Sequence, residues 1–159
     1  MTEALNALEK NIIEIGSIQQ KSPKKKLRTK TNNPFFEPKI KKAGLIKLYD
    51  LAVDHRIIDD EVVPEETFLN VLMSNNPEAL DNEIIFSADN QVATFFLNCI
   101  MPLFRNLSHS QISKSLSFRN KYGKLLNQND LDKANFLFNS KPKNQSSLKL
   151  EKEVNEIIL

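Results

Sequence analysis

The sequence has one cysteine, two histidines and three glycines, and each small number excludes a class of protein. Cys99 has no partner for an intrachain disulfide, so a reducing compartment is expected. One cysteine and two histidines, in this spacing, do not supply the ligands of a structural zinc site. So few glycines, among many Leu, Ile, Lys and Glu residues, favour helices over a turn-rich sheet.

Long apolar runs are missing as well. The longest, Cys99 to Phe104, is cut by Pro102 and is far shorter than the ~20 residues that span a bilayer. No uninterrupted apolar segment follows a basic start at the N-terminus, so no secretory signal peptide is expected. We therefore expect a soluble, cytoplasmic protein without a membrane partner.

Catalytic motifs are absent from the sequence. It contains no phosphate-binding loop, no GxSxG and no dinucleotide-binding fingerprint. Cys99 lies in a strongly apolar segment, where thiols are usually inert. The acidic residues between 59 and 66 lack the alternating ligands and the glycine of a calcium loop, and capping and helix-dipole roles explain them. The sequence predicts a protein that is not an enzyme, with no cofactor, no metal and no small-molecule substrate.

What the sequence does have is segregated charge. Residues 1–42 carry 10 basic against 4 acidic side chains, residues 43–104 carry 2 against 11, and residues 105–159 carry 10 against 5. The net charge of +2 conceals this asymmetry. Such a distribution indicates a basic surface for a polyanion, an acidic surface for another partner, or pairing of the two within the chain.

The two ends of the chain have separate characters. Residues 1–20 are predicted to form an amphipathic helix, which either docks on its own domain or joins copies of the chain into a homo-oligomer. Residues 21–37 are predicted to form a flexible basic linker, which is either solvated or lies along phosphates. Residues 140–159 predict a linker and a C-terminal helix that docks back or meets a partner. The apolar stripe of the first helix consists of Leu5, Leu8, Ile12 and Ile15.

Between these ends, residues 38–139 predict a compact, mainly α-helical domain. A helix is expected over 38–57, and Pro64 should open a second one. Residues 83–86 are expected to form at most one short β-element. Ser87 or Asp89 should then cap a helix that is apolar on nearly every side, which predicts the centre of the core.

The C-terminal part of this domain, residues 107–138, has the rhythm of a helix-turn-helix. Ser108 caps a first amphipathic segment, and Ile112, Leu116 and their small neighbours fit the first half of the pattern. A second segment then carries Arg119, Lys121 and Lys124, and Gly123 stands where an aliphatic residue is expected. The alternative is two helices of a plain bundle with a solvated basic face.

Three blocks of the chain resemble the RteC-type helical regulators carried by mobile elements of Bacteroides-like bacteria. These blocks are LIKLYDLAVDHRIID (45–59), EIIFSADNQVATFFL (83–97) and KSLSFRNKYGKLL (114–126). The resemblance covers about residues 43–138 and rests on the order of helices and on apolar spacing. It implies a DNA-binding regulator with its helix-turn-helix at the third block.

We therefore hypothesise a non-enzymatic protein that binds nucleic acid, DNA in the first place, as a regulator from a mobile element or phage. The alternative is a protein–protein adaptor that uses the acidic middle segment and the amphipathic terminal helices. The candidate nucleic-acid-binding residues are Lys24, Lys25, Lys26, Arg28, Lys114, Arg119, Lys121 and Lys124.

Overall fold

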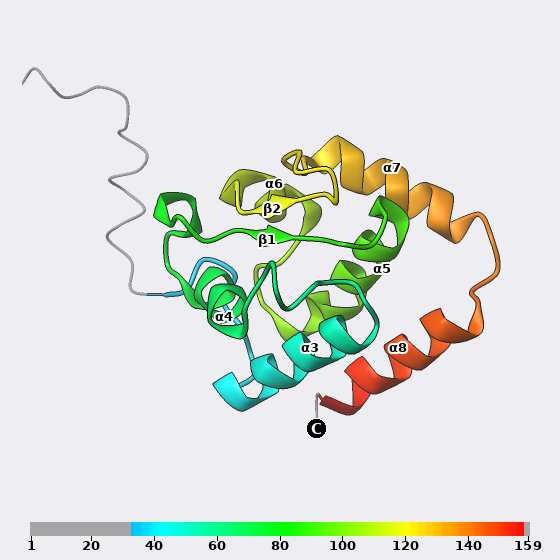
Figure 1. Ribbon diagram of the computed structural model, residues 1–159, viewed down its shortest axis with the longest axis horizontal. Helices are drawn as coiled ribbons and strands as arrows, with labels where there is room; N and C mark the ends of the chain where they lie inside the picture. The colour runs from blue at the N-terminus through cyan, green and yellow to red at the C-terminus, as the bar shows by residue number, and fades with distance from the viewer. Residues whose placement is uncertain (1–32, 158–159) are drawn as a thin grey trace, which may run out of the picture. The chain divides into compact units, whose positions relative to one another are not determined.

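The computed structural model describes residues 33–157 of the chain, which are mainly helical (Figure 1). The predicted basic arm with Lys24, Lys25, Lys26 and Arg28, and the predicted stripe of Leu5, Leu8, Ile12 and Ile15, lie outside the described residues. The helices are α3 (Lys42–Asp54), α4 (Glu65–Met73), α5 (Asn90–Ile100), α6 (His109–Ser115), α7 (Gln128–Asn139) and α8 (Gln145–Ile157). Two 3-10 turns, η1 (Pro77–Ala79) and η2 (Met101–Leu103), and two short strands, β1 (Ile84–Ile85) and β2 (Phe118–Arg119), complete the fold.

Helix α5 is the centre of the core, as its apolar sequence predicts. Asp89 caps it by accepting a hydrogen bond from the Val92 backbone N–H at 3.0 Å. Phe96 and Leu97 are each 1% exposed, and the helix packs against both α7 and α8 (Figure 1). Most of this helix is therefore covered, as a strongly apolar helix requires, whereas Val92 near its N-terminal end is 36% exposed.

The C-terminal helix α8 docks on the rest of the domain. Its buried side chains, Leu150 and Val154, face α3 and α5. His55, at the end of α3, lies 2.7 Å from a carboxylate oxygen of Glu153. Leu150 and Val154 of the C-terminal apolar stripe are therefore covered by the domain itself.

The two strands form a parallel pair that joins distant parts of the chain. Ile84 lies beside Phe118 and Ile85 beside Arg119. The Phe118 ring packs edge-on against Phe36 and stacks with Phe86, at centroid distances of 5.9 and 6.2 Å. The predicted strand at 83–86 is present, and its partner is the segment for which a second helix was expected.

That second helix is absent, and its prediction is wrong. Arg119 lies in β2, and Lys121 and Lys124 lie in a turn that leads back to Leu125, which bridges Arg119 in antiparallel fashion. Gly123 has a φ of +83°, which a right-handed helix does not allow. The next helix, α7, begins only at Gln128, so α6 and α7 are separated by a strand and a turn.

Segments near both ends of residues 33–157 contact the helical domain. Phe36, at the end of the predicted linker, is fully buried, and the Lys39 N–H donates to the Leu103 carbonyl at 2.8 Å. The linker before the last helix ends earlier than expected, because α8 begins at Gln145. Within residues 33–157, no helix combines the length and apolar character needed to cross a membrane.

Candidate nucleic-acid interface

The segment Asn120–Lys124, called here the basic turn, is a hairpin loop held by the side chain of its first residue. The Asn120 carboxamide oxygen accepts hydrogen bonds from the backbone N–H groups of Tyr122 and Lys124, at 2.9 and 3.0 Å. The Asn120 carbonyl accepts from the Gly123 N–H at 2.9 Å. An Asn that bonds the backbone two residues onward, followed by a residue with positive φ, is a typical device of tight loops.

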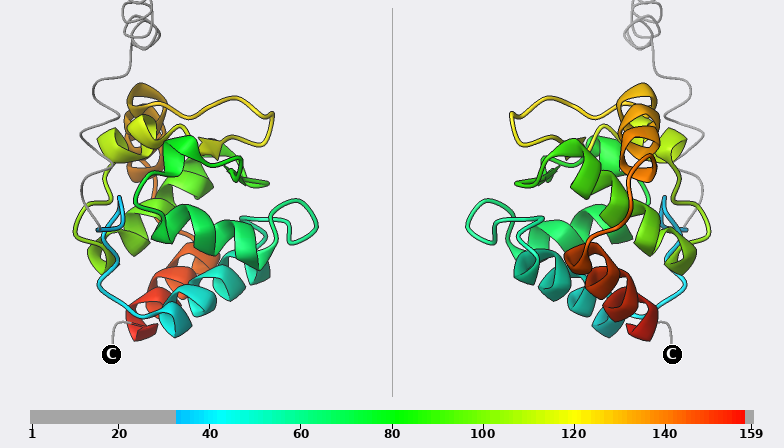
Figure 2. Two further views of the ribbon diagram at one scale, coloured as in Figure 1. Left: turned by 90° about the vertical axis from the view of Figure 1, so that its left-hand side faces the viewer. Right: turned by 90° about the vertical axis from the view of Figure 1, so that its right-hand side faces the viewer.

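This turn presents three side chains to solvent. Lys121, Tyr122 and Lys124 are all exposed, and Tyr122 is 83% exposed, the highest value among the large hydrophobic side chains of residues 33–157. The Lys121 ammonium lies 5.4 Å from the Tyr122 ring centroid. Within the described part of the chain, neither lysine forms an ion pair. Figure 2 shows this loop, just before α7, reaching out from the body of the domain.

Arg119, also a predicted binding residue, is engaged inside the fold. Its Nε donates to Glu83 at 2.8 Å and its Nη1 donates to the Gly123 carbonyl at 2.7 Å. The hydrogen bond to Glu83 raises the pKa of Arg119. Arg119 therefore ties the basic turn to the segment before β1, and its hydrogen-bonding capacity is partly used there.

The remaining predicted residue of this region, Lys114, is exposed in the last turn of α6. That helix ends at Ser115, and the next residue, Leu116, has a φ of 54° that turns the chain into β2. Lys114 is not among the residues that line the cavity beside the basic turn. The structure thus brings Lys121 and Lys124 together in one loop. Lys114 lies on α6, and Arg119 is bonded to other parts of the fold.

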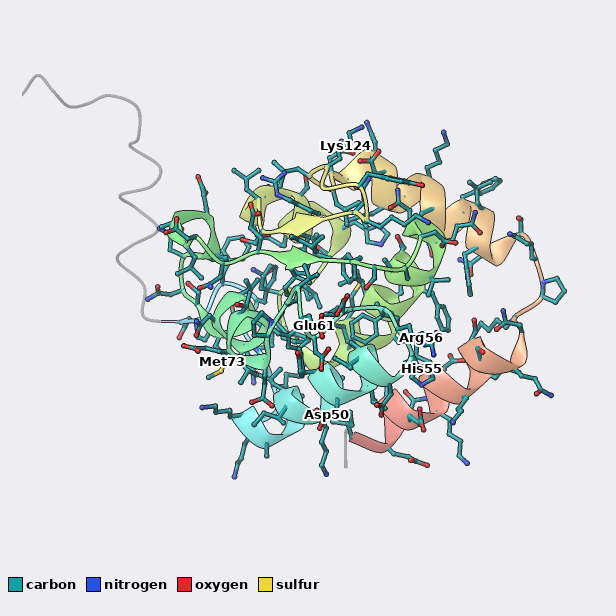
Figure 3. The ribbon with its side chains drawn as sticks, viewed as in Figure 1. Asp50, His55, Arg56, Glu61, Met73 and Lys124 are labelled. Atoms are coloured by element: carbon teal, nitrogen blue, oxygen red, sulfur yellow. The ribbon has the colours of Figure 1, made fainter. Side chains whose placement is uncertain are left out.

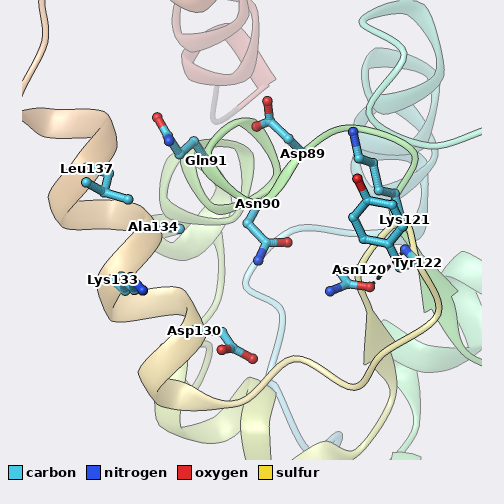
Figure 4. Close-up of a pocket in the computed structure, with 10 residues that line it drawn as sticks. All are labelled: Asp89, Asn90, Gln91, Asn120, Lys121, Tyr122, Asp130, Lys133, Ala134 and Leu137. Atoms are coloured by element: carbon cyan, nitrogen blue, oxygen red, sulfur yellow. Dashed lines mark hydrogen bonds between the residues drawn. The ribbon is translucent and has the colours of Figure 1, made fainter.

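A cavity of about 430 Å³ lies beside the basic turn, and we call it the turn groove (Figure 4). The turn forms one wall, α7 forms another with Lys133 and Leu137, and the N-terminal end of α5 closes the third side. Its full lining is Asp89, Asn90, Gln91, Asn120, Lys121, Tyr122, Asp130, Lys133, Ala134 and Leu137. The groove therefore combines amides, carboxylates, ammonium groups and one aromatic ring.

Sequence reasoning missed most of this groove, although two local signals were present. Asn followed three residues later by Gly, as in Asn120 and Gly123, is typical of a β-turn. A second signal stood nearby, because Asn127 and Asp130 form a capping box that starts α7. Together they predict a turn and then a new helix. The contributions of α5 to the groove had no such local signal.

The acidic loop before α4 lies apart from the basic turn. Figure 3 shows Lys124 at the edge formed by the basic turn and α7, apart from Asp50 and Glu61. Asp59, Asp60 and Glu61 are exposed in the loop before α4. The exposed loop before α4 therefore forms no ion pair with the basic turn within residues 33–157. Two other acidic residues of the middle segment do lie close to the turn, since Glu83 binds Arg119 and Asp89 lines the cavity beside it.

The two histidines hold helices together. His109 accepts or donates toward Asp132 at 2.6 Å and Asn98 at 3.0 Å, and so connects α6 with α7 and α5. His55 connects α3 with α8. Among residues 33–157, no three His, Cys, Asp or Glu side chains are grouped so that they could hold a metal ion.

Burial, with a smaller contribution from Glu151, raises the pKa of Cys99 to about 12.

Comparison of the chain with protein-family models, with curated proteins and with solved structures finds no match.

Proposed function

We propose that this protein binds nucleic acid without transforming it, and that the basic turn is the element that contacts the phosphates. The observation that carries the proposal is the projecting loop in which Lys121 and Lys124 flank an exposed Tyr122. Neither ammonium forms an ion pair within residues 33–157, and such ammonium groups can replace the counterions of a phosphate backbone. The resemblance to RteC-type regulators suggests the same class of partner.

The geometry favours contact by the turn over contact by a reading helix. A helix-turn-helix joins its helices by a turn of about 3–4 residues, whereas β2 and the basic turn lie between α6 and α7. Helix α7 carries Asp130 and Asp132 beside Lys133. A helix with two carboxylates and one ammonium is poorly suited to the negative potential of a DNA groove. The helix-turn-helix form of the hypothesis is therefore replaced by a loop-mediated one.

A binding role also fits the chemistry of the one thiol. With a pKa of about 12, Cys99 is protonated at neutral pH, and a thiol is a far weaker nucleophile than a thiolate. The carboxylates near the basic turn cap helices, as Asp89 does for α5 and Asp130 for α7. Helix capping thus accounts for these carboxylates, and no catalytic role is needed to explain where they lie.

The test is a retardation assay with the full chain, in which two charge-reversed variants are compared. The site variant is Lys121→Glu with Lys124→Glu, and the control is Lys149→Glu with Lys152→Glu, two exposed lysines of α8. Both variants change the net charge equally. Each phosphate contact contributes about 0.7–0.9 to the slope of log affinity against log salt, so the site variant should lower that slope by roughly 1.4–1.8.

Two results would contradict this proposal. The first is wild-type protein that retards neither single-stranded nor double-stranded DNA at low salt. The second is equal weakening by both variants, because a general electrostatic effect would then replace a site.

The adaptor hypothesis remains the alternative, with the acidic loop before α4 as its contact surface. Its C-terminal part is disfavoured, because α8 buries Leu150 and Val154 against the domain. Light scattering of the full chain and of a chain without residues 1–20 separates the two hypotheses. An oligomer that dissociates on truncation, together with no DNA retardation, would favour the adaptor.

A further inference from the structure

We infer that the turn groove holds one unpaired base of a single-stranded nucleic acid, stacked on Tyr122, while the adjoining phosphates contact the lysines at its rim. This inference rests on the proposed function and narrows it from nucleic acid in general to unpaired strands. It follows from the combination of an exposed ring, a cavity and the mixture of polar groups around that cavity.

The aromatic ring is placed as a stacking platform. Tyr122 is 83% exposed, and the ring contact that the structure gives it is the Lys121 ammonium, 5.4 Å from its centroid. Base–aromatic stacking stabilises single-strand complexes and tolerates any sequence, because every base has a π-face. Leu137, 40% exposed on α7, and Ala134 supply apolar surface across the groove. A cavity of about 430 Å³ lies within the usual range of small-ligand pockets.

The polar groups of the groove match the edge of a base. Asn120 uses its carboxamide oxygen on the backbone, which leaves its Nδ2 as a donor toward the groove (Figure 4). Asn90 and Gln91 form no side-chain hydrogen bond within residues 33–157, so each offers a donor and an acceptor. Base edges present both donors and acceptors, and amides of this kind read them in unstacked nucleotides.

The carboxylates place the base inside the groove and the phosphates outside it. Asp89 and Asp130 each use one oxygen to cap a helix, and both line the cavity. Two carboxylates in the groove would repel a phosphate there, because like charges at short range are unfavourable. Lys121 and Lys133 lie on opposite walls and are exposed, so phosphates on either side of the inserted base can reach them.

An inserted base has to leave its stack and its partner, which costs several kcal/mol in a duplex and far less in a single strand. A protein that gains affinity from this groove should therefore prefer unpaired strands. The phosphate contacts of the basic turn, by contrast, are available to both forms. The two contributions can be separated by removing the ring and the charges independently.

The experiment measures the affinity of the full chain for a single strand of roughly 12 nucleotides, a length within the range of known single-strand sites, and for the same sequence as a duplex. Wild-type protein should bind the single strand at least ~10-fold more tightly at equal salt. Tyr122→Ala should lose about 10-fold or more affinity for the single strand, as stacking of one base implies, and a smaller factor for the duplex, whose bases stay paired. Tyr122→Phe, which keeps the stacking ring, should stay close to wild type.

A spectroscopic signal reports on the same contact. The chain has no tryptophan and two tyrosines, of which Tyr49 is buried at 7% exposure. Stacking on Tyr122 should quench tyrosine fluorescence when the single strand is added. Tyr122→Phe should bind without this quenching, because the remaining Tyr49 is shielded in the core.

The outcomes distinguish the two proposals. If neither form of DNA binds, the proposed function fails and this inference fails with it. If both forms bind equally, and Tyr122→Ala changes neither while reversal of Lys121 and Lys124 weakens both, the function stands and the base site is overturned. Loss of single-strand affinity in Tyr122→Ala with an unchanged salt slope supports the base site, because the ring carries no charge.

Discussion

Replacement of Gly123 by alanine tests the structure of the basic turn with a result of definite sign. Gly123 has a φ of +83°, and its N–H donates to the Asn120 carbonyl. An L-residue at such a φ is strained, whereas glycine is not. A second helix that ran unbroken through Gly123, as a helix-turn-helix in this segment would need, would respond in the opposite way.

The magnitude can be stated because steric contact does not contribute. A Cβ added at Gly123 meets no atom within 4 Å, so the whole effect comes from the backbone conformation. In the turn, Gly123→Ala should lower the free energy of unfolding by about 1 kcal/mol. In an exposed helix interior the same substitution should raise it by about 1 kcal/mol. The two structures therefore differ by ~2 kcal/mol for one substitution.

Urea denaturation at equilibrium provides the measurement. With an m-value of about 1–3 kcal/mol/M, the midpoint of Gly123→Ala should fall by roughly 0.3–1 M while m is unchanged. Gly123→Asn is the matched control, since Asn tolerates positive φ better than other L-residues, and its loss should be smaller. A midpoint that rises on Gly123→Ala would refute the turn and restore the helix.

Three further experiments test other parts of the fold: a glycine substitution after α3, a pair of alanine substitutions in α8, and alkylation of Cys99. Arg56, exposed at a φ of 60° just after α3, occupies a position where glycine is preferred, so Arg56→Gly should raise the free energy of unfolding by about 1 kcal/mol in the same titration. Leu150→Ala should destabilise the protein by about 2–5 kcal/mol, whereas Leu148→Ala on the exposed side of α8 should change little; similar small losses would show that α8 does not dock. Because the pKa of Cys99 is raised from 9.0 to about 12, alkylation at pH 8 should be about 1,000-fold slower in native than in unfolded protein. The free energy of unfolding should also decline as pH rises from 9 toward 12, since the unfolded chain then releases the thiol proton first. Equal alkylation rates in the two states would contradict the burial of this thiol.

Local signals in the sequence were sufficient for the helices that form the core. The periodicity of α3, the Pro and acidic residues at the start of α4, and the capping residues Asp89 and Ser108 each act within one or two helical turns. Such interactions depend on neighbours in the chain, so they can be predicted without knowledge of the fold. The burial of α5 followed from the same kind of argument, because a helix without a polar face has to be covered.

In the segment after α6, the helix-turn-helix pattern was followed although local residues indicated a turn. The spacing of Ile112 and Leu116 fitted a helix-turn-helix, and the pattern was then extended across Gly123. Asn120 and Gly123 were a stronger signal, because a carboxamide that bonds the backbone competes with helix formation. Phe118 is buried beside Ile84, and a strand that gains both a partner strand and a ring contact overrides weak helix propensity.

The sequence by itself determined the helical class, the presence and order of the core helices and the concentration of basic residues near position 120. It did not fix their ends, because the helix expected over 38–57 spans Lys42–Asp54. Only the tertiary structure decided that Arg119 is bound to Glu83, that the Tyr122 ring is exposed, and that α5 and α7 meet the basic turn around one groove. The physical reason is range. Caps and periodicity act between residues a few positions apart, whereas the groove joins segments from Asp89 to Leu137 whose proximity depends on how the whole core packs.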